Sequence, residues 1–445
     1  MIQISRFQKE QLLITTYEPK EKTMPKITLT NDQKAAVKAF VDFLFRPNEK
    51  YFIIQGSAGS GKSTLIKVLH DTIQAQYKMY ALLLQGDPNE DEFETVLTAT
   101  TNKAALVLEE LTDMPATTIH QFLNITVTYN KQTGRPRLVK KKNWGVLYNK
   151  LVIVDEASMV GEDLYRLLDE TTENCKVILI GDQYQLSPIT ESRSVMETLP
   201  CSKVIMNQVM RHGGIIKDIS TQFRDTVETK IFKNIPDVPA VKHVDGPTFQ
   251  ALIDQAFTDK NYSLKSAKIL AWTNDIIHAY NSHIRKLKGF PEMLSAGETV
   301  FTNNPIRYGD YHRNVDSEVY ISKVGDPSIS YGVHGRIVEL NKAADFFLPN
   351  NPYEVKALLN KLAKDSKWSE HYAIKNTWLD LRPAYASTVH KAQGSSYDTV
   401  FINLSDIGRC TIASETARLL YVAISRAVKQ IYFYGKLPAR YCEAV

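Results

Sequence analysis

A glycine-rich stretch near the start of the chain has the residue types and the spacing of a phosphate-binding loop. Residues 56–64 match the pattern G-x-x-x-x-G-K-[ST] in full, between an apolar run at 51–54 and a periodic run at 65–69. Glycines let the backbone turn its N–H groups toward phosphate oxygens, and the helix that follows adds partial positive charge. We expect Lys62 to reach the β- and γ-phosphates and the Ser63 hydroxyl to bind Mg²⁺. The candidate nucleotide-binding residues of the loop are Gly56, Ser57, Ala58, Gly59, Ser60, Gly61, Lys62, Ser63 and Thr64.

Two adjacent carboxylates, Asp155 and Glu156, follow the apolar run 151–154. An aspartate at the carboxyl end of a strand beside a phosphate loop can hold Mg²⁺, and the next residue can polarise an attacking water as general base. Adjacent acids are common on surfaces, so this interpretation depends on the complete phosphate loop upstream. Gln185 follows the next apolar run, 177–180, and can hydrogen-bond a γ-phosphate or the attacking water. A polar turn is the alternative for Gln185.

Nine stretches of the sequence resemble the motifs of superfamily 1 helicases of the RecD/Dda group, and they follow one another in the same order as in that family. They cover nearly the whole chain and close with His-Lys-Ala-Gln-Gly-Ser and Tyr-Val-Ala-Ile-Ser-Arg-Ala. The stretches are Gln33, the phosphate loop, 99–105, 118–120, 155–156, 181–188, 208–211, 387–395 and 421–427.

The resemblance implies further roles at the nucleotide site. By position, Gln33 contacts adenine, Gln185 senses the γ-phosphate, and Gly394 lies against the nucleotide. Arg211 and Arg426 correspond to arginine fingers from a second domain, which in such enzymes contribute on the order of 10³–10⁵ in rate. The alternative for each arginine is a surface ion pair. The implied cofactors are ATP and Mg²⁺.

The resemblance also implies contacts to a single DNA strand. Hydroxyl, amide and lysine side chains suit contact with a phosphate backbone without reading of the bases. For the threonines the alternative is helix capping. The residues that match by position are Thr101, Asn102, Lys103, Thr118, His120, Thr388 and His390.

Residues 124–150 form a strongly basic segment that contains no acid. The pieces 125–129 and 137–139 flank Gln-Thr-Gly, which predicts a β-hairpin. The segment lies where the family carries a strand-separating pin, and the cations together with Tyr129 and Trp144 favour nucleic acid over a solvated face. Its candidate DNA contacts are Arg135, Arg137 and Lys140.

The composition sets broad limits on the class of protein. The sequence is 43% hydrophobic and 23% charged with a net charge of +5, a composition that is ordinary for a globular protein. A chain of 445 residues is too long for one hydrophobic core, so we expect at least two domains. No apolar run is long enough for a membrane span, and residues 1–26 lack the layout of a signal peptide. The four cysteines are far apart, which argues against a zinc site or disulfide framework and fits a reducing cytoplasm, that of a bacterial host if the chain is phage-encoded.

Short apolar runs alternate with helical stretches, which predicts an α/β fold with parallel sheets. With the resemblance, we expect two RecA-like motor domains, the pin hairpin and an SH3-like β-barrel insertion with a short tower at 351–378. The expected boundaries are 1–25 for an N-terminal extension, 26–120 and 151–200 for the first motor domain, 121–150 for the pin, 201–290 and 381–445 for the second motor domain, and 291–380 for the insertion.

The resemblance implies an ATP-dependent DNA helicase that moves 5′→3′ on single-stranded DNA and unwinds duplex, with roles in replication, repair or recombination. Expected partners are single-stranded DNA, single-strand/duplex junctions, and single-strand-binding or replication proteins, with a monomeric enzyme and no membrane. One alternative is a DNA-dependent ATPase that translocates or strips proteins without unwinding. A nucleotide-gated DNA-binding module is another, although Glu156, Gln185 and Arg426 argue against negligible turnover. A small-molecule kinase leaves the later motifs unexplained, and RNA as the track stays open.

Overall fold

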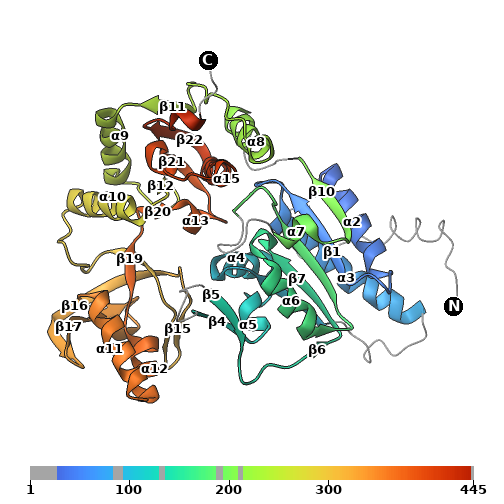
Figure 1. Cartoon of the computed structure of the whole chain (residues 1–445), viewed down its shortest axis with the longest axis horizontal. Coiled ribbons are helices and arrows are strands. Elements are labelled where there is room, and N and C mark those ends of the chain that lie inside the picture. Colours follow the sequence, from blue (N-terminus) through green and yellow to red (C-terminus); the bar gives the residue numbers. More distant parts are fainter. Residues whose placement is uncertain (1–27, 84–93, 130–135, 187–193, 209–213, 442–445) are drawn as a thin grey trace.

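The computed structural model describes residues 28–83, 94–129, 136–186, 194–208 and 214–441. Three β-sheets organise these residues, two of them parallel and one antiparallel (Figure 1). The expectation of an α/β fold with parallel sheets is confirmed.

The first sheet has six parallel strands in the order β10-β1-β9-β7-β2-β3. Alternate side chains of its central strands face two separate cores, one formed with α2, α3 and α4 and the other with α5, α6 and α7. The strands are β1 (Tyr51–Gly56), β2 (Glu94–Ala99), β3 (Ala116–Thr118), β7 (Lys150–Asp155), β9 (Lys176–Gly181) and β10 (Ser202–Met206). The helices are α2 (Asn31–Leu44), α3 (Lys62–Leu83), α4 (Asn102–Thr112), α5 (Ile119–Phe122), α6 (Glu162–Thr171) and α7 (Val195–Thr198).

The second sheet has five parallel strands in the order β11-β22-β21-β12-β20. Helices α8, α13, α14 and α15 pack on one face, and α9 and α10 on the other. The strands are β11 (Val241–Val244), β12 (Ala267–Ala271), β20 (Ala386–Thr388), β21 (Tyr397–Asn403) and β22 (Ala427–Tyr434). The helices are α8 (Gly214–Thr229), α9 (Gly246–Thr258), α10 (Asn274–Leu287), α13 (Val389–Ala392), α14 (Leu404–Ile407) and α15 (Ala413–Ile424).

The third sheet is antiparallel, with the strand order β18-β17-β16-β13-β19, and it carries the helical pair α11 and α12 (Figure 1). Its strands are β13 (Thr299–Thr302), β16 (Glu318–Ser330), β17 (Val333–Leu340), β18 (Ala344–Pro349) and β19 (Leu381–Pro383), and its helices are α11 (Pro352–Lys364) and α12 (Trp368–Thr377). Short pairs complete the described structure. They are β4 (Ile125–Tyr129) with β5 (Pro136–Lys140), β6 (Leu147–Tyr148) with β8 (Thr172–Glu173), and β14 (Ile306–Tyr308) with β15 (Tyr311–Arg313).

Two expected boundaries need correction. The first motor domain was expected to end at residue 200, yet β10 pairs with β1 and extends the first sheet to Met206. β10 is an edge strand whose side chains alternate in exposure, so it lacks the continuous apolar run that marks a central strand. The insertion was expected to end at residue 380, yet β19 pairs with β13 and belongs to the third sheet. Within the described ranges, no helix combines the length and the apolar character that crossing a membrane requires.

Candidate active site

The phosphate loop lies between β1 and α3 and is curled on itself. Gly59 and Gly61 both have φ of +81°, a conformation that favours glycine. A side chain at Gly61 would also place its Cβ 2.5 Å from Gln33 Nε2. The Lys62 ammonium folds back over the loop and donates to the carbonyls of Gly56 at 2.7 Å and Ser57 at 3.2 Å. The loop therefore has the shape and the charge expected of a phosphate cradle.

A cavity of about 320 Å³ lies over the loop, between the first and second sheets. Most of the predicted nucleotide-site residues line it, and one side of α4 adds an apolar wall that the sequence analysis missed. The lining residues are Ala58, Gly59, Gly61, Lys62, Ser63, Thr64, Ala104, Val107, Leu111, Asp155, Glu156, Gln185, Gly394 and Arg426.

The acid pair lies at the carboxyl end of β7 on the wall of this cavity. Asp155 is only 6% exposed and accepts a hydrogen bond from the backbone N–H of Glu156 at 2.9 Å. Burial, and then the negative charge of Glu156, holds the pKa of Asp155 above its usual range. Glu156 itself has φ of +52°, an unusual conformation for a residue with a side chain. The two carboxylates and the Ser63 hydroxyl line the same cavity, and together they form a set of oxygen ligands that fits Mg²⁺ held together with phosphates.

Gln185 is 2% exposed and lines the same cavity. Its Nε2 donates weakly to Asp182 at 3.4 Å, while its Oε1 is buried and has no hydrogen-bond partner among the described residues. A buried amide oxygen is costly to leave without a donor. Its position on the cavity wall fits contact with a water or a ligand.

Arg426 enters the cavity from the second sheet and is 1% exposed. Its guanidinium donates to the carbonyls of Val422 at 3.0 Å and Ser395 at 3.2 Å, and to the Ser425 hydroxyl at 2.8 Å. These bonds hold a buried cation opposite the phosphate loop. Arg211, the other candidate finger, lies outside the described residues.

Side chains of the second sheet's helices also reach the first sheet across the cavity. The hydroxyl of Tyr421 on α15 accepts from the backbone N–H of Ala58 at 3.0 Å and donates to Asp182 at 2.5 Å. On the same helix, Arg418 donates to the carbonyls of Gln183 and, at 2.6 Å, Gln185. The sequence analysis missed both, although Tyr421 lies within a quoted motif.

Gln33 lies behind the loop rather than on the cavity wall. Its Oε1 accepts from the backbone N–H of Thr30 at 3.0 Å, and its Nε2 donates to the Gly61 carbonyl at 3.3 Å. Both ends of its amide are therefore engaged by backbone groups.

The candidate strand contacts lie at the ends of short elements. Thr101, Thr118 and Thr388 are the N-caps of α4, α5 and α13, accepting from backbone N–H groups at 3.2, 3.2 and 3.4 Å. Each of these hydroxyl oxygens therefore caps a helix, which was the alternative to a DNA contact for these threonines. Asn102 is the first residue of α4.

The two candidate histidines have different surroundings. Burial, and then the charge of Lys141, lowers the pKa of His120. The Nε2 of His390 lies 3.7 Å from the carboxylate of Glu415, with the side chain partly exposed. Lys103 donates to the Ser395 hydroxyl across the cleft.

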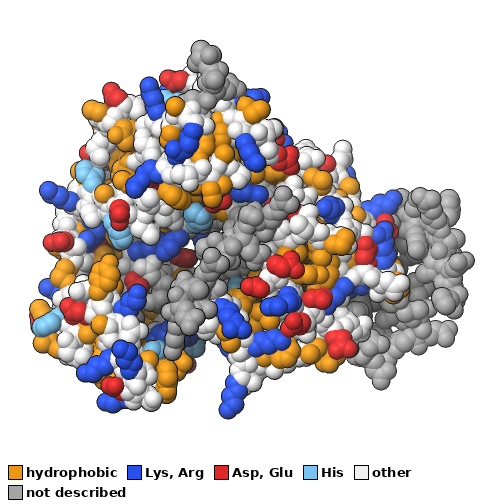
Figure 2. All heavy atoms as spheres, in the orientation of Figure 1, with side chains coloured by type: hydrophobic (Ala, Val, Ile, Leu, Met, Phe, Trp, Pro, Cys, Tyr) orange, Lys and Arg blue, Asp and Glu red, His pale blue; other side chains and the backbone are white. Residues whose placement is uncertain are grey.

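The predicted hairpin at 124–150 is present as β4 and β5, with Thr128 opposite Arg137. Lys140 donates to Glu170 at 2.8 Å and lies 3.7 Å above the ring of Trp144, whose Nε1 donates to Thr171 at 3.0 Å. These contacts fasten the hairpin base to α6. On the face shown in Figure 2, acidic and basic side chains are interspersed over the first sheet's helices. Arg137 is exposed, and Arg135 lies outside the described residues.

Two family models match the chain. The AAA domain model matches residues 28–244, and the UvrD-like helicase C-terminal domain model matches residues 383–434. These ranges contain the phosphate loop, the acid pair and Arg426.

Relatives match over most of the chain. It is 24% identical over 459 residues to the ATP-dependent DNA helicase dda of Enterobacteria phage T4, covering 91% of this chain and 99% of that protein. It is 29% identical over 413 residues to the ATP-dependent RecD2 DNA helicase of Deinococcus radiodurans, covering 87% of this chain and 47% of that one. A crystal structure of Pif1 helicase from Bacteroides with ADP-AlF3 and ssDNA has a TM-score of 0.53 at 16% identity, covering 94% of both chains, which shows a shared fold.

The order of the motifs, the two family models and the relatives agree, and together they support assignment of the chain to the superfamily 1 helicases of the RecD, Pif1 and Dda type.

Proposed function

We propose that this protein is an ATP-dependent DNA helicase that moves 5′→3′ along single-stranded DNA and separates duplex ahead of it. The observation that carries the proposal is the cavity with a phosphate loop and an acid pair on one side and the buried Arg426 on the other. The relatives named as ATP-dependent DNA helicases support the reaction and its use of ATP, and Mg²⁺ is the usual partner of ATP in phosphoryl transfer.

ATP, bound with Mg²⁺, would be the substrate: water attacks its γ-phosphorus, the bond to the β-phosphate breaks, ADP leaves, and this hydrolysis supplies the free energy for movement. In our proposal, Lys62 binds the terminal phosphates, while Ser63 and Asp155 hold the metal. Glu156 accepts a proton from the attacking water, and Gln185 orients that water. Arg426 neutralises the charge that develops on the transferred group.

Residues from both parallel sheets contribute to this site. Lys62, Asp155 and Glu156 belong to the first sheet, whereas Arg426 belongs to the second. Catalysis is therefore complete only when the cleft is closed, so turnover is tied to relative movement of the motor domains. If each domain grips the strand in turn, closing and opening become steps along DNA.

The remaining assignments belong to the same proposal. The β4–β5 hairpin serves as the pin that splits the duplex, and the antiparallel sheet serves as the SH3-like insertion beside it. The strand runs past the amino ends of α4, α5 and α13, where Thr101, Thr118 and Thr388 lie. The fold shared with Pif1 supports this path.

Strand separation on matched duplexes with a 5′ or a 3′ single-stranded tail tests the proposal directly. With ATP and Mg²⁺, only the 5′-tailed duplex opens, and a Lys62→Ala variant opens neither. Opening of the 3′-tailed duplex alone contradicts the polarity. DNA-stimulated hydrolysis without opening of either duplex contradicts unwinding.

The main rival is a translocase that strips proteins from DNA without unwinding. The pairing of Lys140 with Glu170 favours this rival, because that cation of the hairpin is already engaged within the fold. Replacing residues 126–139 with a short glycine-serine turn discriminates between the two functions. A helicase loses strand separation and keeps DNA-stimulated hydrolysis, whereas a translocase keeps its protein-stripping activity unchanged.

A further inference from the structure

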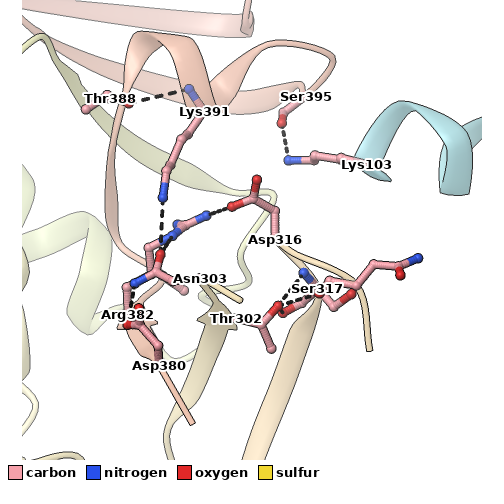
Figure 3. A network of polar contacts seen from close by, with 12 residues as sticks. Lys103, Thr302, Asn303, Asp316, Ser317, Asp380, Arg382, Thr388, Lys391 and Ser395 are labelled. Carbon is pink, nitrogen blue, oxygen red and sulfur yellow. Dashed lines mark hydrogen bonds and ion pairs between the residues drawn. The ribbon is translucent and has the colours of Figure 1, made fainter. Parts of the chain in front are cut away.

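Lys103 makes a contact between the two motor domains that its expected role as a DNA contact does not explain. It lies in the first turn of α4, and its ammonium donates to the hydroxyl of Ser395, which follows α13 in the second domain (Figure 3). Ser395 is buried, so the bond is formed within the cleft rather than on an open surface.

The segment 393–395 connects this contact to the catalytic groups. The carbonyl of Ser395 accepts the hydrogen bond from Arg426 Nη1 at 3.2 Å. Two residues earlier, Gln393 Nε2 lies 3.5 Å from the Glu156 carboxylate. The hydroxyl of Ser395 is thus held from the first domain while its carbonyl holds the arginine.

From this geometry we propose that Lys103 and Ser395 form an interdomain latch that positions Arg426 for hydrolysis. The inference rests on the proposed function and assigns Lys103 as a positioning residue. The bond joins two domains, so it forms only in the closed cleft. Closure then fixes segment 393–395, and the Ser395 carbonyl in turn fixes the Arg426 guanidinium.

The surroundings of the latch keep the ammonium directed at its partner. Burial lowers the pKa of Lys103, the negative charge of Asp316 opposes this shift, and Arg382 and Arg426 add to it. Asp316 is itself bound by Arg382 (Figure 3). A half-buried ammonium is stabilised by a hydrogen-bond acceptor, and Ser395 supplies one.

The same network reaches an end of the candidate DNA path. The Asn303 side-chain oxygen accepts from Arg382 at 3.0 Å and from Lys391 at 3.2 Å (Figure 3). The backbone N–H of Lys391 in turn donates to the Thr388 hydroxyl at 3.4 Å. These polar contacts run from Thr388 as far as Asp316, whose negative charge acts on Lys103, so the strand site is connected to the latch through this charge.

Steady-state ATP hydrolysis by Lys103→Met, Ser395→Ala and the double variant tests the latch. At saturating single-stranded DNA, each single variant lowers kcat about tenfold or more, as expected for losing a hydrogen bond to a charged group. The double variant is no slower than the slower single one, because both changes remove one interaction. The DNA concentration for half-maximal stimulation stays within about twofold of wild type, because in this proposal neither substitution removes a contact to the strand.

Three further variants serve as controls. Lys103→Arg keeps a donor and recovers part of kcat. Lys34→Met removes an exposed lysine of α2, away from the cavity lining, and leaves kcat unchanged. Lys62→Ala abolishes hydrolysis. Unfolding midpoints close to wild type show that the latch variants fold.

Other outcomes overturn the proposal. If Lys103→Met raises the half-maximal DNA concentration at unchanged kcat and Ser395→Ala has no effect, Lys103 is a strand contact and not a latch. Multiplicative effects in the double variant, or unchanged kcat in both single variants, also contradict the latch. Absence of DNA-stimulated hydrolysis in wild type is a different result, because it rejects the proposed function itself.

Discussion

At the scale of single residues, the hydroxyl of Tyr421 joins the phosphate loop to α15. The residue is 2% exposed, and its hydroxyl bridges the Ala58 N–H and the Asp182 carboxylate. Burial, and then the charge of Asp182, keeps the pKa of Tyr421 well above its usual range. The hydroxyl therefore stays protonated and remains a donor throughout the neutral pH range.

Tyr421→Phe removes this bridge while keeping the ring that fills the core. Asp182 then loses a buried donor, at a cost of about 1–3 kcal/mol. We expect a kcat for ATP hydrolysis lowered about tenfold, because the loop and the helix that leads to Arg426 are no longer linked. The measurement is kcat at saturating ATP and DNA beside the unfolding midpoint. An unchanged kcat contradicts the linking role.

Glu156→Gln tests the general base with nearly the same side-chain shape. The amide cannot accept a proton from water, so hydrolysis falls by about 10²–10⁴. Nucleotide binding stays close to wild type, since Lys62 and the loop are unchanged. Single-turnover hydrolysis and direct nucleotide binding separate the two effects. The matched control is Glu110→Gln on the exposed side of α4, and equal losses in both variants contradict the assignment.

At the scale of elements, the sequence predicted what local patterns encode. Strands β7 and β9 are buried along nearly their whole length, so uninterrupted apolar runs marked them. Thr30 caps α2 through a capping box with Gln33, a pairing that is encoded within four consecutive residues. The edge strand β10 and the short β19 were assigned to the wrong side of a boundary, because pairing partners distant in sequence define them.

Much of the nucleotide site was predictable from motif spacing, whereas its contacts across the cleft were not. Ala58 and Tyr421 are 363 positions apart, and their meeting depends on how the two sheets pack. For the threonine hydroxyls, the position in the sequence was predictable but the role was not. The same residue type at the same position suits both a helix cap and a phosphate contact, so the pattern could not separate these roles.

The ion pair between Arg285 and Glu298 joins the third sheet to a helix that packs on the second sheet. Arg285 of α10 donates to both oxygens of Glu298, at 2.7 and 2.9 Å, beside the start of β13, and both side chains are buried. Glu298→Ala leaves the buried guanidinium without its carboxylate, with only the backbone carbonyls of residues 292 and 293 as acceptors among the described residues, so we expect a loss of about 3–5 kcal/mol in the free energy of unfolding. Chemical denaturation measures it.

An exposed ion pair in the same domain gives the comparison for Glu298→Ala. Lys429 and Asp398 are 2.9 Å apart, and both are substantially exposed. Asp398→Ala should therefore cost less than about 1 kcal/mol. A loss of equal size in the two variants contradicts the argument from burial.

At the scale of the whole molecule, the closed cleft depends on contacts spread along its length. Arg418 and Tyr421 join α15 to the first domain, Arg224 of α8 donates to the Ser57 hydroxyl at 3.2 Å, and Lys103 reaches Ser395. These contacts surround the nucleotide cavity. A ligand that bridges Lys62 and Arg426 should therefore stabilise both domains together.

This reasoning leads to a prediction for the unfolding of the full chain. A non-hydrolysable ATP analogue with Mg²⁺, at about 100 times its dissociation constant, should raise the free energy of unfolding by about 2.7 kcal/mol. Lys62→Ala should lose most of this gain at the same ligand concentration, because the loop no longer holds the phosphates. Chelation of Mg²⁺ should reduce the gain in the wild type. Thermal unfolding scans with and without ligand measure the effect. An equal rise in Lys62→Ala would mean that the analogue stabilises the chain at some other place than the cavity between the two sheets.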